Sequence, residues 1–193
     1  MKRLLCVLFA AVSLLSYGQQ TGTRDLNVSV GALTGNDLIN VVSEIVVIGA
    51  SLGNITYDNN TGSPAIVIDY KLAVKNNWFL FADGVYQSFG KDIFVSGSAV
   101  GKVRDTFVTI GLGTEYHYVH GSWFQMYSGV SLAYTREFSN YTGSSNDISD
   151  SGNGFMSLQV NALGFRFGKK LAAFTEFGYG YKGIASLGLS FQF

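Results

Sequence analysis

The chain has 193 residues, of which 47% are hydrophobic and 13% are charged, roughly half of the charged fraction of an ordinary soluble domain. Glycine occurs 24 times, aromatic residues make up 15%, and proline occurs once. This composition excludes a disordered chain, which needs low hydrophobicity and high charge, and a helical bundle, because Gly and aromatic residues are poor helix formers. Lys plus Arg equals Asp plus Glu at 13 each, so the charge balance gives no indication of a nucleic-acid partner.

Residues 1–18 have the pattern of a signal peptide. Lys2 and Arg3 provide a positive start, residues 4–15 are almost entirely apolar, and Gly18 supplies a small residue for the peptidase. The apolar segment is too short to cross a bilayer as a helix, which needs about 20 residues. We therefore expect export and cleavage after Gly18, with a buried N-terminal helix as the alternative.

The mature domain is then residues 19–193, a length that suits a single domain. The only cysteine, Cys6, is removed with the signal peptide, so the mature domain has no disulfide and no thiol ligand for a metal. An exported domain without disulfides needs another source of stability, and a closed sheet in a membrane would provide one.

Apolar and polar side chains alternate with a period of two residues, the pattern of strands with unlike faces, in eight segments of the mature domain. For example, Ile68 and Tyr70 alternate with Asp69 and Lys71. The alternating segments begin near Leu26, Ile66, Trp78, Val108, Phe124, Met156, Leu171 and Leu187. The alternation changes phase after Ala162, which predicts a β-bulge there.

The polar faces of these segments consist mostly of Gly, Ser, Thr, Asn and Gln, with a charge or two per strand. A soluble sandwich would turn this face to water and carry many Lys, Glu and Arg on it. Small residues suit instead the narrow interior of an eight-stranded barrel, while large apolar residues on the other face suit lipid. We therefore favour a membrane barrel over a soluble all-β fold.

Connection lengths point to the same fold. The tight connections are residues 75–77, 119–122 and 168–170, and the long ones are 35–63, 90–102 and 139–154. Tight and long connections alternate, as in barrels with short periplasmic turns and longer external loops. The predicted fold is all-β: an eight-stranded antiparallel up-and-down transmembrane β-barrel.

The final segment places apolar residues at every second position, at Leu187, Leu189, Phe191 and Phe193. This pattern resembles the terminal signal of bacterial outer-membrane barrels, which the barrel-assembly machinery recognises. The mature chain looks like the small barrels of the outer-membrane protein A and X types, and residues 18–20 are similar to signal sites common in Bacteroidota. The resemblance implies a porin-like barrel in the outer membrane of a Gram-negative cell, with outer-membrane lipid and lipopolysaccharide as partners. It specifies compartment and assembly, and no activity.

Residues 36–50, inside the first long connection, depart from the barrel pattern. One helical stripe holds Leu38, Val42, Ile45, Val46 and Gly49, while Asn40, Ser43 and Glu44 lie off it. Asn36 or Asp37 can cap such a helix. The many β-branched residues speak against a helix, so an extra hairpin strand is the alternative. We favour a short amphipathic helix at the membrane surface or over the barrel mouth.

Ionisable residues occur on the faces expected to point into the lumen. They are Asp69, Lys71, Asp83, Glu115, His117, Glu137, Arg166 and Glu176. One interpretation is a proton or ion path. The interpretation that we favour is a network of paired charges that fills and stabilises a narrow lumen, because buried charges must be paired. Acids outnumber bases in this set. Either Lys71 and Arg166 would each be shared by more than one carboxylate, or one carboxyl would carry a proton.

His120 and Ser122 are the one arrangement that resembles catalysis. Barrel lipid A deacylases use a histidine and a serine separated by one residue with an acid nearby, for which Glu115 is the candidate. The segment reads as a tight turn on the periplasmic rim, however, whereas those enzymes act at the outer leaflet. His117 and His120 are expected to point in different directions, so no metal site is predicted, and no cofactor motif occurs.

The favoured function is therefore a monomeric outer-membrane barrel with a structural or surface-interaction role and no enzymatic activity. A small pore for ions or solutes and a lipid A-modifying enzyme are the alternatives.

Overall fold

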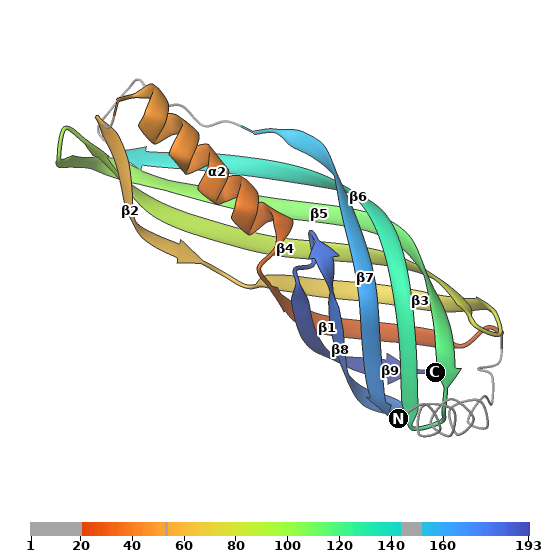
Figure 1. Cartoon of the computed structure of the whole chain (residues 1–193). Coiled ribbons are helices and arrows are strands. Elements are labelled where there is room, and N and C mark those ends of the chain that lie inside the picture. The colour runs from red at the N-terminus through yellow and green to blue at the C-terminus, as the bar shows by residue number, and fades with distance from the viewer. Residues whose placement is uncertain (1–20, 53, 144–151) are drawn as a thin grey trace, which may run out of the picture.

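The computed structural model describes residues 21–52, 54–143 and 152–193. The predicted signal peptide, residues 1–18, lies outside the described residues. The described elements are β1 (Arg24–Ala32), α2 (Gly35–Ala50), β2 (Ile55–Gly62), β3 (Ala65–Lys75), β4 (Trp78–Val95), β5 (Ser98–His120), β6 (Phe124–Gly143), β7 (Gly154–Gly168), β8 (Leu171–Gly180) and β9 (Ala185–Gln192) (Figure 1). No helix in these ranges is long and apolar enough to cross a membrane.

Eight of the strands form a closed antiparallel barrel. β1 pairs with β3, β3 with β4, and each later strand with its successor as far as β9, which pairs back with β1. The three tight connections follow β3, β5 and β7, as the sequence predicts. The predicted eight-stranded up-and-down barrel is confirmed.

β2 prolongs one barrel strand. It pairs with the far half of β4, from Ile55 opposite Val95 to Gly62 opposite Phe89, while β3 pairs with the near half. Only Ser63 and Pro64 separate β2 from β3. Because proline has no backbone N–H, it cannot continue the ladder, and the strand is interrupted at this point.

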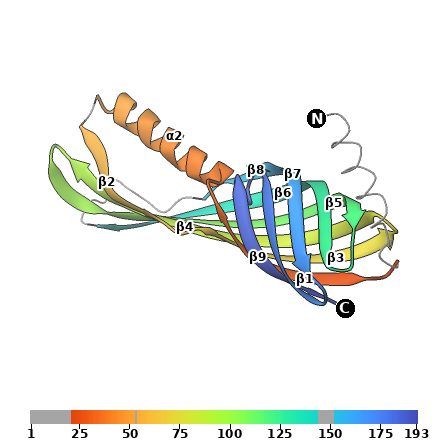
Figure 2. The ribbon, with the colours of Figure 1, turned by 60° about the horizontal axis from the view of Figure 1, so that its bottom comes forward.

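The expectation of a long loop over 90–102 is wrong. β4 and β5 continue through it as paired strands and are joined only by Ser96 and Gly97, both at positive φ. The first long connection likewise contains a strand, β2, as well as the helix. Strands β4, β5 and β6 thus extend beyond the short strands β1, β8 and β9, and α2 lies along this extension (Figures 1 and 2). We use the word extension for the part of β2, β4, β5 and β6 that lies beyond the level of Gln87 on β4.

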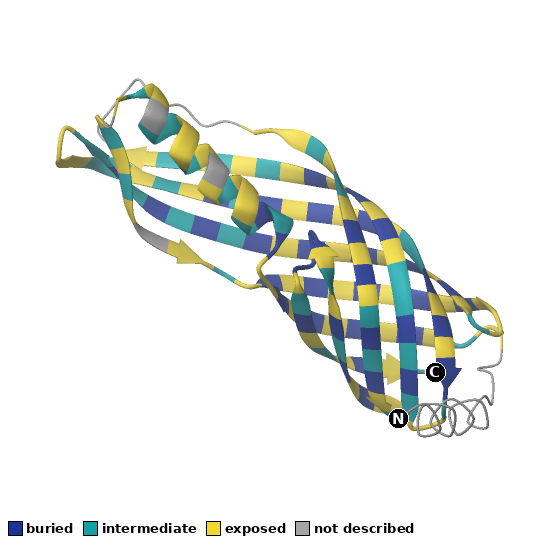
Figure 3. Cartoon of the chain, in the orientation of Figure 1, coloured by how far each residue is buried: buried dark blue, intermediate teal, exposed yellow. Residues whose placement is uncertain are grey.

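The two faces of the barrel wall differ as predicted. Buried and exposed residues alternate along the strands (Figure 3). On β5, Ile110 is 70% exposed while the adjacent inward-facing Thr109 is 1% exposed. Large aliphatic side chains thus point outward, while polar side chains and buried aromatic rings such as Phe79, Phe81 and Phe174 fill the interior.

The outward face changes from apolar to polar along β4 and β5. On neighbouring strands the outward pair Tyr86 and Val108 belongs to the apolar region, and the next outward pair, Ser88 and Thr106, begins a polar region. Beyond this level the apolar residues Phe89, Ile93 and Phe107 are buried inside together with the charged Lys91 and Asp105, and Asp92, Lys102 and Arg104 lie on the outer face. We call the apolar outward region below this level the belt.

The predicted bulge is confirmed. The register between β7 and β8 shifts between Asn161 and Leu163, and the β6–β7 register shifts opposite it, between Tyr127 and Gly129. The extra residue lies on β7 and brings Gly164 and Arg166 to the inner face, whereas β6 alternates without interruption and Tyr127 is buried inside.

The helix predicted for residues 36–50 is present as α2, and the predicted cap is wrong. Thr34, not Asn36 or Asp37, is the capping residue: its hydroxyl accepts a bond of 3.2 Å from the Asp37 N–H, and the Asp37 carboxylate accepts one from the Thr34 N–H. This reciprocal pair satisfies two free donors of the first turn. The Asn36 side chain instead donates to Gln87 of β4 at 3.3 Å.

Two glycines, one on each face of the wall, test whether side chains fill the interior. A Cβ on inward-facing Gly113 would overlap the Phe81 ring and the Ser131 side chain, whereas one on outward-facing Gly84 meets nothing within 4 Å. We expect Gly113→Val to lower the free energy of unfolding by about 1–3 kcal/mol through overpacking. Gly84→Val should change it by under about 0.5 kcal/mol. Urea unfolding in lipid vesicles measures both, and equal losses would contradict a filled interior.

Candidate functional site

The largest concentration of charge in the barrel surrounds Lys71, which is buried on β3. Its ammonium Nζ lies 2.9 Å from Glu115 Oε2 on β5, 3.4 Å from Glu176 Oε1 on β8 and 3.7 Å from Asp69 Oδ1. β3 and β8 are separated by β1 and β9 in the wall, so these contacts cross the lumen. One cation thus joins three strands through the interior.

Further side chains form hydrogen bonds with the same carboxylates. Tyr127 Oη donates to Glu176 Oε1 at 2.8 Å and Asn161 Nδ2 to Glu176 Oε2 at 2.9 Å. Asn27 Nδ2 donates to Asp69 at 2.8 Å, and His117 Nε2 lies 2.8 Å from Glu115 Oε1. A buried ion pair is tolerable when its remaining lone pairs are satisfied in this way. These residues form what we call the Lys71 cluster.

A second ion pair lies farther along the lumen. Lys182 Nζ is 2.9 Å from Asp83 Oδ2, which also accepts a bond of 2.8 Å from the Tyr181 hydroxyl. Ser131 Oγ is 2.7 Å from the same hydroxyl, and the Lys182 ammonium lies 4.5 Å from the centre of the Phe81 ring. Lys182 and Tyr181 follow directly after β8, so the chain turns inward there before β9.

Sequence reasoning missed Lys182 and Tyr181. Neither residue is in the set that the alternation pattern places in the lumen. The signal that could have found Lys182 is the charge balance, because the acids expected in the lumen outnumber the bases and need another cation.

A third group of charges lies at the mouth, within the extension. Lys91 Nζ is 3.1 Å from Asp105 Oδ2 on β5 and 3.4 Å from Glu44 Oε1 on α2, and it donates to Asn40 Oδ1 at 2.7 Å. One turn below, Gln87 Nε2 donates to Asp37 Oδ1 at 3.3 Å. The polar side of α2 is therefore attached to the inner face of the extension.

The predicted lumen residues do not form one network. Asp69, Lys71, Glu115, His117 and Glu176 come together in the Lys71 cluster, while Asp83 pairs with Lys182.

Glu137 and Arg166 lie apart from both clusters. Glu137 is only half-buried, at the level of the mouth, where burial and then the neighbouring Asp105 raise its pKa. Arg166 is buried at the opposite end, where Nε donates to Ser190 Oγ at 3.0 Å and Nη2 to the Lys169 carbonyl at 2.8 Å. Lys71 is thus shared by several lumen carboxylates as expected, whereas Arg166 is not, because it is directed to the turn.

The two histidines lie side by side, contrary to the expectation that they point in different directions. The β5–β6 register shifts between His117 and Val119, so both His117 and His120 turn inward, and their ring centroids are 4.8 Å apart. Both ring nitrogens of His120 lack a hydrogen-bond partner, and Ser122 is exposed. The geometry therefore does not assemble His120, Ser122 and Glu115 into a catalytic arrangement. Within the described ranges no group of three possible metal ligands occurs.

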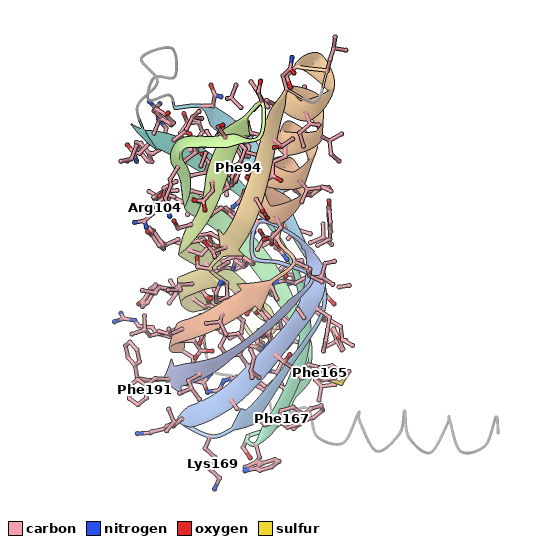
Figure 4. The ribbon with its side chains drawn as sticks, turned by 90° about the vertical axis from the view of Figure 1, so that its left-hand side faces the viewer. Phe94, Arg104, Phe165, Phe167, Lys169 and Phe191 are labelled. Atoms are coloured by element: carbon pink, nitrogen blue, oxygen red, sulfur yellow. The ribbon has the colours of Figure 1, made fainter. Side chains whose placement is uncertain are left out.

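The four residues of the expected assembly signal, Leu187, Leu189, Phe191 and Phe193, lie on the outward face at or directly after β9 and are exposed. Phe191, Phe165 and Phe167 lie at the end of the molecule opposite to Phe94 and Arg104 (Figure 4). Aromatic side chains thus gather at the end where the tight turns lie.

Comparison with solved structures identifies the fold. The attachment invasion locus protein Ail of Yersinia pestis, in complex with the heparin analogue sucrose octasulfate, matches with a TM-score of 0.51 and 10% identity over 90% of this chain and 100% of that chain. The fold resembles outer-membrane β-barrel proteins such as Ail. The N-terminal β-barrel domain of Pseudomonas aeruginosa OprF has a TM-score of 0.46 and 12% identity over 91% of this chain and all of its own. No protein-family model and no curated protein sequence matches the chain.

The Lys71 cluster makes a stability prediction. Lys71→Met leaves three buried carboxylates facing one another without a cation, so we expect a loss of about 3–5 kcal/mol in the free energy of unfolding. Removing one acid as well, in Lys71→Met/Glu115→Gln, should recover part of the loss. The control is Lys102→Met, because Lys102 is an exposed lysine paired with Asp92 and its pair is worth about 1 kcal/mol or less. If Lys71→Met costs no more than Lys102→Met in urea unfolding, the cluster does not stabilise the barrel.

Proposed function

We propose that this chain is an integral outer-membrane β-barrel protein with a structural or surface-interaction role, a lumen filled by its own side chains and no enzymatic activity. The observation that carries the proposal is the broad outward face of exposed apolar side chains on the closed barrel wall, which ends at Tyr86 on β4 and Val108 on β5, where polar outward residues follow. An apolar outward band that ends along the strands is what the boundary between hydrocarbon and water imposes on a barrel.

The belt itself favours a lipid environment. Its outward side chains include Leu80, Ile110, Leu112, Leu132 and Leu158, all exposed. Soluble monomeric proteins rarely expose contiguous apolar patches beyond a few hundred Å². In a bilayer the same side chains contact acyl chains, and the closed ladder leaves no strand edge of the barrel in hydrocarbon. Outer-membrane lipid and lipopolysaccharide are therefore the partners that we propose, with the barrel-assembly machinery during insertion.

The lumen supports a structural role more than a pore. Lys71 and Lys182 each reach carboxylates on strands across the barrel, and the rings of Tyr127, Phe81 and Phe174 pack around the two ammonium groups. Side chains of this size just fill an eight-stranded barrel. We therefore do not propose conduction, and we place the extension, whose outer face carries Lys102 and Arg104, outside the cell as the surface for interactions.

The direct test is extraction and gel migration of the protein as expressed in a Gram-negative host. We expect it to fractionate with the outer membrane, to need detergent for extraction, and to migrate differently before and after boiling, because folded barrels resist the gel detergent. A mature polypeptide that remains dispersed and monomeric in plain buffer would contradict the proposal.

A charge scan measures the position of the belt. Arg at outward-facing Leu112, in the middle of the belt, should cost about 2–4 kcal/mol of unfolding free energy in vesicles. Arg at outward-facing Asn140 of β6, in the extension, should cost under about 1 kcal/mol because that position is in water. Reversible urea unfolding followed by tryptophan fluorescence gives both values. Similar costs at the two positions would mean that the apolar region does not contact hydrocarbon.

A further inference from the structure

We propose that a groove between the first turns of α2 and the outer wall of β7 and β8 holds an acyl chain of an outer-leaflet lipid. This inference rests on the proposed membrane location of the belt. It assigns a role to α2, whose apolar side has no protein cover in the described structure.

The groove has a volume of about 330 Å³. Leu38 and Ile39 of α2 form one wall, and Met156, Leu158, Val160 and Tyr179 of the barrel form the other. None of its lining residues carries a charge. The volume is at the lower end of the range for ligand pockets, about 300–1,000 Å³, which suits a single slender apolar group better than a lipid headgroup.

The contacts of α2 explain why its apolar side faces away from the protein. Asn40 and Glu44 bind Lys91, and Asp37 binds Gln87, so the polar side is fixed inward. The opposite side then presents Leu38, which is 54% exposed, together with the exposed Val41, Ile45 and Val46. An amphipathic helix in water normally turns this side to the core, so an outward apolar side requires an apolar neighbour.

The position of the groove indicates that the apolar neighbour of α2 is hydrocarbon. Met156 and Leu158 are paired in the β6–β7 ladder with Tyr134 and Leu132, which are outward-facing residues of the uppermost belt. The barrel wall of the groove is thus a continuous part of the belt. An acyl chain can enter it sideways from the outer leaflet, whereas a protein partner would have to displace lipid from the belt. The absence of charged lining residues agrees with binding through the chain and not through a phosphate.

The test uses single tryptophan probes in the full mature protein. Trp78 and Trp123 are replaced by Phe, and Trp is placed at Leu38 in the groove, at Leu132 on the belt, or at Leu52, which is 91% exposed beyond the end of α2. Each variant is reconstituted in phosphatidylcholine vesicles with or without brominated acyl chains, and gel migration before and after boiling confirms folding. We expect Leu38→Trp to lose fluorescence to the brominated chains to the same extent as Leu132→Trp, and Leu52→Trp to lose none.

The outcomes separate this inference from the proposed function. If Leu132→Trp is not quenched, the belt does not face lipid and the proposed function fails. If Leu132→Trp is quenched while Leu38→Trp behaves like Leu52→Trp, the proposed function is supported and the proposal of an acyl-chain groove is wrong. Protection of Leu38→Trp from both brominated lipid and aqueous iodide would indicate a protein cover, such as a second copy, and would also overturn it. Ile39→Trp serves as a second probe of the same groove if Leu38→Trp does not fold.

Discussion

Closure of the backbone ladder is the constraint on which the rest of the structure depends. β9 returns to β1 in continuous register, from Ala32 opposite Ala185 to Asp25 opposite Gln192. Since the wall has no free edge below the extension, its backbone polar groups are satisfied without water, and the outward side chains are free to be entirely apolar. The polar groups of the sequence must then be placed inside, where each needs a partner. The charge clusters of the lumen follow from this requirement.

For four of the interior carboxylates, two cations meet this requirement. Lys71 and Lys182 serve the carboxylates of Asp69, Glu115, Glu176 and Asp83, and amide, phenol and imidazole groups supply the remaining hydrogen bonds. A hydrophobic interior would be at least as stable in principle, since buried ion pairs gain little net energy. The contacts that cross the lumen do, however, connect specific strands, so each cluster favours one register of the wall. Tyr127 of β6 adds a hydrogen bond to Glu176 of β8 across the intervening strand β7.

The sequence predicted the barrel well because the belt obeys one simple rule over many residues. Alternation placed Asp69, Lys71 and Glu115 inside and Ile68 and Ile110 outside, and a phase slip located the bulge. The alternation rule fails in the extension, where the outward residues are polar. In the extension the apolar residues Phe89, Ile93 and Phe107 face inward, opposite to the apolar residues of the belt. The apolar–polar alternation therefore has no single phase along this segment, and the sequence pattern indicates a loop.

Local irregularities account for the other errors. A register shift between His117 and Val119 turns His120 inward, and the turn after β8 brings Lys182 into the lumen. These positions depend on contacts between distant strands, which a single sequence does not reveal. Thr34 could have been found, since a threonine three residues before an aspartate is a recognised capping pattern.

The break at Pro64 divides the molecule into two tiers. Every pair that closes the barrel through β3 lies on one side of this proline, while β2 and α2 lie along the extension on the other. Unfolding of β2 and α2 would therefore leave the barrel ladder intact. Opening of the barrel, by contrast, would also detach β2 and α2 from the wall. Cooperative units of this kind have separate opening free energies. The outer tier of β2 and α2 can thus reorganise while the closed ladder of the inner tier stays intact.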